Sequence, residues 1–79
     1  MRTARRIRRF VEEELLEGMR LDGDPLARGY LDSLAIEQLI LFCEERYGIE
    51  LVDEDTVAEH FANVGALAAL VDRKRKERP

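Results

Sequence analysis

Hydrophobic residues recur every three or four positions in three stretches of the chain, the spacing of α-helices that each bury one face. The first stretch predicts a helix that Thr3 caps and that ends at Gly18. The second predicts a helix that begins at Ser33 or just before it and ends at Gly48, and the third a helix capped by Asn63. The predicted inward positions are Ile7, Phe10, Val11 and Leu15 in the first helix, Ile36, Leu39, Ile40, Cys43 and Tyr47 in the second, and Val64, Leu67, Leu70 and Val71 in the last.

The segments between these helices differ from one another. Residues 19–31 carry two glycines and an Asp-Pro pair, so we expect a long loop there. Residues 49–52 have the pattern of a short strand, but no other segment is suited to pair with it. Residues 53–61, with acidic side chains in the first turn, predict a short third helix. The pattern therefore predicts an all-α fold, a four-helix bundle with a long first loop and a short third helix.

The chain has the size and composition of one small compact domain. It has 79 residues, of which 46% are hydrophobic and 38% charged. We expect a single domain over residues 1–79, with a core over about 3–72 and a solvated basic tail over 73–79. The apolar runs 39–43 and 66–71 are far too short to span a bilayer. No secretion signal is visible, so we expect a cytoplasmic protein with no membrane association.

Charge is distributed unevenly along the chain, although its net value is only −4. Residues 12–60 hold 15 acidic and 3 basic side chains, a net charge of −12, whereas the two ends together carry +8. This acidic middle favours a positively charged protein partner and argues against nucleic acid as the main ligand. A rival interpretation is a small helical interaction or nucleic-acid-binding module, which would require the basic ends to converge on one face.

Cysteine and histidine, which often take part in catalysis or metal binding, occur once each. Cys43 is the only cysteine, which excludes a disulfide within the chain, and it lies among apolar helical positions where a free cysteine acts as a small hydrophobe. His60 is the only histidine and has no second histidine or cysteine as a partner. We therefore expect no metal site and no nucleophilic catalysis through His60.

The outward arc of the second helix mixes apolar and acidic side chains. Leu34 and Leu41 fall in the middle of this arc, and the other members are one amide and three carboxylates. An apolar spot rimmed by charge is typical of a transient docking surface, although single exposed leucines are also common. The six residues of the arc are Leu34, Glu37, Gln38, Leu41, Glu44 and Glu45.

Ser33 stands at the start of this helix, in the stretch "YLDSLAIEQLILF" of residues 30–42. Serine and aspartate are both favoured as helix caps, so either Asp32 or Ser33 could serve only to begin the helix. Neither residue is followed by the glutamate or glutamine of a capping box, and Ser33 lacks the glycines of a nucleophile elbow. A helix start also offers unpaired N–H groups and a positive dipole end, which suit a phosphodiester on Ser33.

The chain resembles acyl carrier proteins and the related peptidyl carrier domains. Asp32-Ser33-Leu34 is similar to the Asp-Ser-Leu motif of this family, whose serine receives the 4′-phosphopantetheine arm of coenzyme A. The likeness extends to "LAIEQLILFCEERYGIEL", "VDEDTVAEHF" and "NVGALAALV", and so covers about residues 3–72. The tripeptide alone is a weak signal, whereas its place at the start of the second of four helices is specific.

The resemblance implies a role for each residue of the site. Ser33 would carry the arm, and Asp32 and Leu34 would belong to the motif that a phosphopantetheinyl transferase recognises. The outward arc, Leu34, Glu37, Gln38, Leu41, Glu44 and Glu45, would dock the transferase, an activating ligase or adenylation enzyme, and a downstream acyltransferase, synthase or tailoring enzyme. Charge reversal at Glu44 would then weaken loading without unfolding the domain. Ile36, Leu39, Ile40, Cys43, Val64 and Leu67 would line a core that opens, in some members, to shelter an acyl chain.

Departures from the family pattern bear on the kind of carrier. Many fatty-acid carriers have a glycine two residues before the aspartate, where this chain has Tyr30 and places its glycine at Gly29. Gly-x-Leu-Asp-Ser is more similar to stand-alone carriers for D-alanyl, other aminoacyl, glyceryl or small polyketide units. We therefore expect a discrete carrier of a specialised polyketide, nonribosomal peptide or aminoacyl-transfer pathway. The alternatives are a fatty-acid-synthesis carrier and a carrier-like scaffold without the arm.

Overall fold

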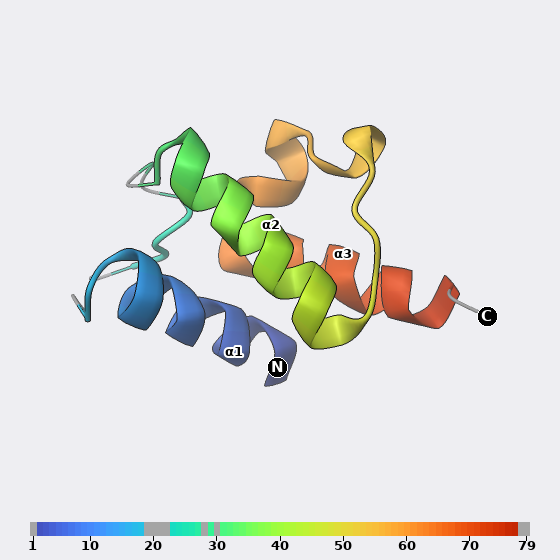
Figure 1. Cartoon of the computed structure of the whole chain (residues 1–79), viewed down its shortest axis with the longest axis horizontal. Helices are drawn as coiled ribbons and strands as arrows, with labels where there is room; N and C mark the ends of the chain where they lie inside the picture. The colour runs from blue at the N-terminus through green and yellow to red at the C-terminus, as the bar shows by residue number, and fades with distance from the viewer. Residues whose placement is uncertain (1, 19–22, 28, 30, 78–79) are drawn as a thin grey trace.

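The computed structural model describes residues 2–18, 23–27, 29 and 31–77, and these residues form helices and turns without any strand (Figure 1). The all-α prediction is therefore confirmed for the described part of the chain. There are three α-helices: α1, α2 and α3, which span Arg2–Phe10, Ser33–Tyr47 and Val64–Glu77. A π-helical turn, Val11–Leu15, continues α1, and two 3-10 turns, Asp53–Asp55 and Ala58–Phe61, lie between α2 and α3.

The expected third α-helix over residues 53–61 is absent, and two separate 3-10 turns take its place. Asp55 explains the break. Its carboxylate accepts a hydrogen bond from the Val52 N–H at 3.0 Å, and its carbonyl oxygen is 2.8 Å from the Nδ1 of His60. An α-helix would use that carbonyl for the N–H of residue 59, so the histidine contact replaces a helical hydrogen bond.

The start of α1 also differs from the expectation, because Thr3 lies inside the helix and does not cap it. Its hydroxyl donates to Asp72 Oδ1 at 2.8 Å and so joins α1 to α3. At the other end, the N–H of Leu16 donates to the carbonyl of Val11 at 2.9 Å, the i→i+5 bond of a π-turn. The helical path ends at Leu15, before the predicted stop at Gly18, and the chain then turns through Glu17 and Gly18, whose φ angles are 53° and 84°.

The predicted bounds of α2 are confirmed at both ends. Asp32 has an extended backbone, and its side chain accepts a hydrogen bond from the N–H of Ala35 at 2.9 Å. Gly48 ends the helix with φ of 63°, the left-handed conformation that glycine adopts without steric cost. Residues 49–52 are extended but do not pair as a strand; the side chains of Ile49 and Leu51 are buried in the core instead.

The first turn of α3 is capped twice, once as predicted and once by a distant residue. Asn63 Oδ1 accepts from the N–H of Ala66 at 2.7 Å, which confirms the predicted cap. The carboxylate of Asp24 accepts from the N–H of Val64 at 2.9 and 3.1 Å. The same carboxylate binds the N–H groups of Leu26 and Ala27, so one side chain holds both its own loop and the start of α3. The rest of the expected long loop, residues 19–22, 28 and 30, lies outside the described residues.

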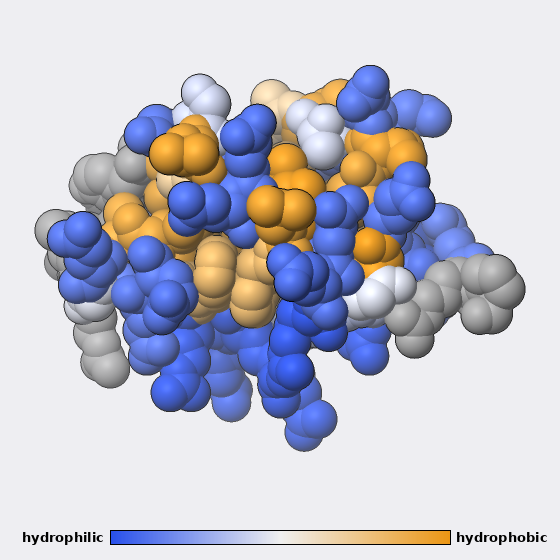
Figure 2. Space-filling view, in the orientation of Figure 1, coloured by the Kyte–Doolittle hydropathy of each residue, from blue (hydrophilic) through white to orange (hydrophobic). Residues whose placement is uncertain are grey.

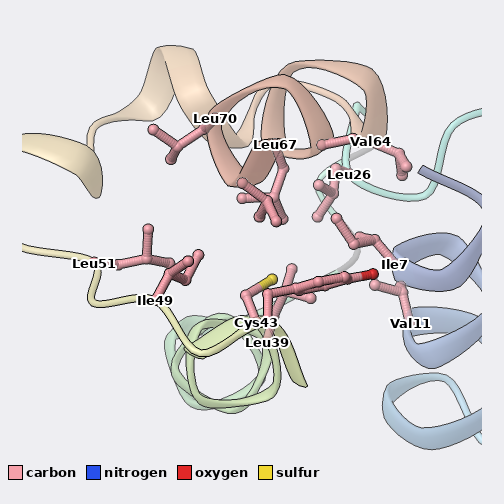
Figure 3. Packing of buried hydrophobic residues seen from close by; sticks show 13 residues of the cluster. Ile7, Val11, Leu26, Leu39, Cys43, Ile49, Leu51, Val64, Leu67 and Leu70 are labelled. Atoms are coloured by element: carbon pink, nitrogen blue, oxygen red, sulfur yellow. The ribbon is translucent and has the colours of Figure 1, made fainter. Parts of the chain in front are cut away.

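One hydrophobic cluster joins the three helices (Figure 3). α1 packs along α3, and α2 also contacts α3. The inward positions predicted from the pattern are buried or pack against this cluster, which also takes in Leu26, Ile49 and Leu51 from the connecting segments. Figure 3 shows side chains from all three helices and both connections pointing toward a common centre. The fully buried members of the cluster are Ile7, Val11, Leu39, Cys43, Leu67, Ala68, Leu70 and Val71.

The described part of the basic tail expected over residues 73–79 is helical, because α3 continues through Glu77, and most of its side chains are exposed as expected. Two side chains fasten this end to the rest of the fold. Lys74 Nζ lies 2.7 Å from Asp55 Oδ2, and the guanidinium of Arg75 lies 5.3 Å from the ring centroid of Tyr47. Residues 78 and 79 lie outside the described residues.

The Asp55–Lys74 pair should make stability depend on pH in the acid range. The hydrogen bond from Lys74 holds the pKa of Asp55 below its usual value, aided by the Val52 N–H. A lowered folded pKa stabilises the fold above the unfolded pKa of about 4, and this contribution is lost as pH falls through the folded pKa. We expect the stability advantage of the wild type over Asp55→Asn, measured by urea unfolding, to be largest near neutral pH and to shrink toward about pH 3.

The matched control for this experiment is Glu59→Gln, which removes one exposed carboxylate from the same segment. Its pH dependence should follow that of the wild type. An Asp55→Asn variant whose deficit stayed constant from neutral to acid pH would contradict the role assigned to the ion pair.

Candidate functional site

The hydroxyl of Ser33 is exposed at the first helical position of α2. Asp32, not Ser33, is the helix cap, so the structure decides between the two residues that the sequence offered for this role. Among the described residues, no hydrogen bond involves the Ser33 hydroxyl. The serine is therefore held in place by the backbone of α2, while its oxygen remains accessible to a reagent or an enzyme in solution. Tyr30, three residues earlier, lies outside the described residues.

The helix start supplies a favourable environment for an anion at this position. The N–H groups of the first turn of α2 point toward its N-terminus, and the aligned peptide dipoles place partial positive charge there. Asp32 satisfies the N–H of Ala35, and the carbonyl of Asp32 accepts from the N–H of Ile36 at 3.0 Å. No described residue forms such a capping bond with the N–H groups of Ser33 and Leu34, which could therefore bind a phosphate oxygen.

Most side chains of the outward arc of α2 are exposed, as the helical pattern predicted. The side chains of Leu34 and Leu41 are 62% and 53% exposed, and Glu37, Gln38 and Glu45 are exposed as well. In Figure 2, apolar and hydrophilic side chains alternate over the front of the molecule where α2 lies.

Glu44 differs from the other members of the arc. Its side chain is half-buried, and Oε2 accepts a hydrogen bond from the N–H of Leu51 at 2.9 Å. This bond holds the extended segment after α2 against the helix. Charge reversal at Glu44 would remove that hydrogen bond, so it would combine any effect on docking with an effect on this segment. Glu37 and Glu45 are the better positions for a test of docking.

The residues expected to line an acyl-chain shelter do come together. Leu39, Cys43, Val64 and Leu67 are buried in the common cluster, and Ile36 and Ile40 pack against it from α2. Burial, with a minor contribution from Glu44, raises the pKa of the Cys43 thiol to about 12. The thiol is therefore protonated at neutral pH and packs as a hydrophobe.

Sequence reasoning missed one feature near the site, a pair of stacked aromatic rings. The rings of Phe10 and Phe42 have centroids 4.1 Å apart and an interplanar angle of 13°, and Tyr47 meets Phe42 edge-on at 6.4 Å. The helical pattern placed Phe10 toward the core and assigned Phe42 no role. The available signal was the position of Phe42, between the inward stripe and the outward arc of α2, where a large side chain can bridge to another helix.

No three His, Cys, Asp or Glu side chains among the described residues are grouped so as to hold a metal ion. No described helix is both long and apolar enough to cross a membrane. No protein-family model matches this chain, and neither the curated proteins nor the solved structures yielded a match.

Proposed function

We propose that this protein is a discrete acyl or aminoacyl carrier whose 4′-phosphopantetheine arm is attached to Ser33. The observation that carries the proposal is that Asp32 and Ser33 have different roles at the start of α2. Asp32 caps the helix, so Ser33 is not needed as a cap, and Ser33 presents an exposed hydroxyl at the positive end of the helix. The resemblance of Asp32-Ser33-Leu34 and its surroundings to carrier proteins gives this hydroxyl its chemical role.

The architecture is compatible with a carrier bundle of four helices. The two 3-10 turns, Asp53–Asp55 and Ala58–Phe61, occupy the place of the short third helix in such a bundle. The buried cluster beneath α2 is where an acyl chain would be sheltered. The long connection before α2 would place the Asp-Ser-Leu motif at one end of the molecule, which suits access by several enzymes in turn.

In this mechanism, partner enzymes carry out the reactions, and this chain holds the cargo in position for them. A phosphopantetheinyl transferase would join the Ser33 oxygen to the pantetheine phosphate of coenzyme A, with adenosine 3′,5′-bisphosphate as the leaving group. When bound, the arm supplies a thiol that carries the cargo as a thioester. A ligase or adenylation enzyme would load that thiol, and a downstream acyltransferase, synthase or tailoring enzyme would use the cargo. Tethering raises the effective concentration of the intermediate at each partner.

The test is the intact mass of the protein after incubation with coenzyme A and a broad-specificity phosphopantetheinyl transferase. The wild type should gain the mass of one phosphopantetheine, and Ser33→Ala should gain none. Ser33→Ala should stay folded, because the hydroxyl makes no hydrogen bond with the described residues. An unmodified wild type beside a modified control carrier would sink the proposal and favour a scaffold without an arm.

Docking through the outward arc of α2 can be tested separately. Both Glu37 and Glu45 are exposed, so Glu37→Lys with Glu45→Lys should leave the circular dichroism spectrum unchanged. We expect the double variant to be modified about tenfold more slowly by the transferase at low salt, with a smaller difference at high salt, because charge complementarity mainly affects association.

A matched double variant, Glu54→Lys with Glu59→Lys, makes the same change of charge at exposed positions outside the arc. It should be modified at a rate close to that of the wild type. Equal slowing of both double variants would show that net charge, and not the arc, governs the encounter.

A further inference from the structure

The outer face of α1 carries a stripe of arginines that the carrier role leaves unused. Arg2, Arg5, Arg6 and Arg9 occupy positions i, i+3, i+4 and i+7, so they share one side of the helix, and all four are exposed. An open groove of about 550 Å³ runs beside this stripe between α1 and α2, and Arg46 of α2 also lines it. Five guanidinium groups from two helices therefore surround one groove, which we call the arginine groove.

The floor of the arginine groove is apolar. The stacked rings of Phe10 and Phe42 line it and are only partly buried. The same two rings continue into an adjoining hollow of about 540 Å³, which Leu41, 53% exposed, also lines. In Figure 2, an apolar strip lies between α1 and α2, and hydrophilic side chains project below it along α1. The groove thus combines an apolar anchor site with positive charge.

Most of this positive charge is not neutralised within the described part of the protein. Arg9 forms an ion pair with Glu13 at 3.2 Å, in which both side chains are more than half exposed. Arg2, Arg5, Arg6 and Arg46 make no ion pair with a described carboxylate. The C-terminal part of α3 adds to the field, because Arg75 lines a hollow together with Arg2, Arg6 and Arg46. The two basic ends of the sequence therefore do meet, at the end of α2 that is remote from Ser33.

We propose that the arginine groove docks an acidic amphipathic segment of a partner protein. Glutamates or aspartates of the segment pair with the arginine stripe, and one large apolar side chain rests on the Phe10–Phe42 pair. The stripe from Arg2 to Arg9 is about 10 Å long, which matches about two turns of a partner helix. Charge complementarity supplies fast association, and the apolar anchor supplies the contact that slows dissociation.

Two other polyanionic surfaces fit the groove less well. Glu13 and Glu14 also line the arginine groove, and Glu45 lines the adjoining hollow. A nucleic acid, with a phosphate at every step, would meet these carboxylates, whereas a peptide can place neutral or basic residues opposite them. An anionic membrane would require an apolar face of α1 to insert, but Ile7 and Val11 on that face are fully buried in the core.

The groove extends the carrier proposal without depending on it. Ser33 and Arg46 are separated by 13 residues of α2, or about 20 Å along the helix axis. A segment bound near Arg46 therefore leaves the N-terminus of α2 open. An acidic partner could hold the carrier at this groove while an enzyme reaches Ser33 past Leu34 and Glu37. Contacts of that enzyme with Gln38, Leu41 and Glu45 would compete with the partner, because these three residues line the adjoining hollow.

The experiment uses a fluorescein-labelled peptide of about 15 residues, built from glutamates with leucines at helical spacing, and measures its fluorescence anisotropy with the full chain. We expect saturable binding by the wild type and a loss of at least about tenfold in affinity for Arg5→Glu with Arg6→Glu. The control, Arg73→Glu with Lys76→Glu, makes the same change of charge at exposed positions of α3 and should bind within about twofold of the wild type. Arg46→Gln, on the other wall, provides a second test that leaves α1 intact.

Several results would overturn the proposal. Absence of saturable binding, or equal losses in the groove and control variants, would show that the groove is not a specific site. Equal binding of a peptide with serines in place of the leucines would show that the apolar floor is not used. Tighter binding of a single-stranded DNA oligonucleotide, or of phosphatidylglycerol vesicles, would assign the groove to those ligands instead. Ser33→Ala should bind the peptide as the wild type does, because Ser33 is not part of the arginine groove. The peptide experiment can therefore fail while the carrier proposal holds, and the carrier proposal can fail while the peptide still binds.

Discussion

Replacement of Leu67 by alanine should cost about 2–5 kcal/mol of unfolding free energy, the largest loss we expect from a single change in this protein. Leu67 is fully buried, and Figure 3 shows it pointing from α3 into the centre of the cluster. Removing its isobutyl group leaves a cavity that neighbours on three helices cannot all close. A chain of 79 residues is expected to have a total stability of only about 4–12 kcal/mol, so the variant should be close to unfolding.

Urea unfolding followed by circular dichroism measures this loss. The matched control is Leu34→Ala, which makes the same chemical change at a side chain that is 62% exposed. The control should change stability by no more than about 0.5 kcal/mol. Equal losses for the two variants would contradict the placement of Leu67 at the centre of the core and of Leu34 on the surface.

The second large effect should come from Asp24→Ala, with an expected loss of about 2–3 kcal/mol. Its carboxylate accepts hydrogen bonds from the N–H groups of Leu26, Ala27 and Val64. The last of these bonds joins residues 40 positions apart, so the substitution removes one of the two caps of α3 and loosens the loop from that helix at the same time. The partly buried N–H groups of Leu26 and Val64 would lose a charged acceptor, which costs more than the loss of a neutral one.

Asn63→Ala provides the comparison for Asp24→Ala, because it removes the other cap of α3. The Asn63 side chain accepts a hydrogen bond only from the N–H of Ala66. It should cost about 1 kcal/mol. Thermal or urea unfolding of both variants gives the two values. A smaller loss for Asp24→Ala than for Asn63→Ala would show that the long-range hydrogen bonds add nothing to the local cap.

The sequence predicted those features of the fold that depend on local pattern. Apolar spacing located all three α-helices and most of the buried positions, and Gly48 and Asn63 marked helix ends through chemistry that acts within one turn. Two of the misplaced features depend on distant partners. Thr3 has the chemistry of a cap but instead binds Asp72, and Lys74 belongs to a basic run but pairs with Asp55. No local signal reveals a partner that the fold brings in from another segment.

The same distinction applies to the candidate site. The helical phase of α2 was sufficient to predict that Leu34 and Leu41 would be exposed, and it identified the start of the helix as the position of Ser33. It could not decide which of Asp32 and Ser33 would cap, because both residue types are favoured there and the choice depends on backbone angles at one residue. It also could not show that Glu44 turns toward Leu51, which lies beyond the end of the helix.

The burial of Cys43 has a consequence for the chemoselectivity of the modified protein. Cys43 is the only cysteine in the chain, and its thiol, inside the core, has a pKa raised to about 12. Reaction with an activated acyl group requires a thiolate, so this sulfur is both shielded and unreactive near neutral pH. In a protein bearing the arm on Ser33, the terminal thiol of that arm would be the single nucleophilic sulfur at the surface. Each molecule would then accept one cargo, at one place, and the core sulfur would not compete for it.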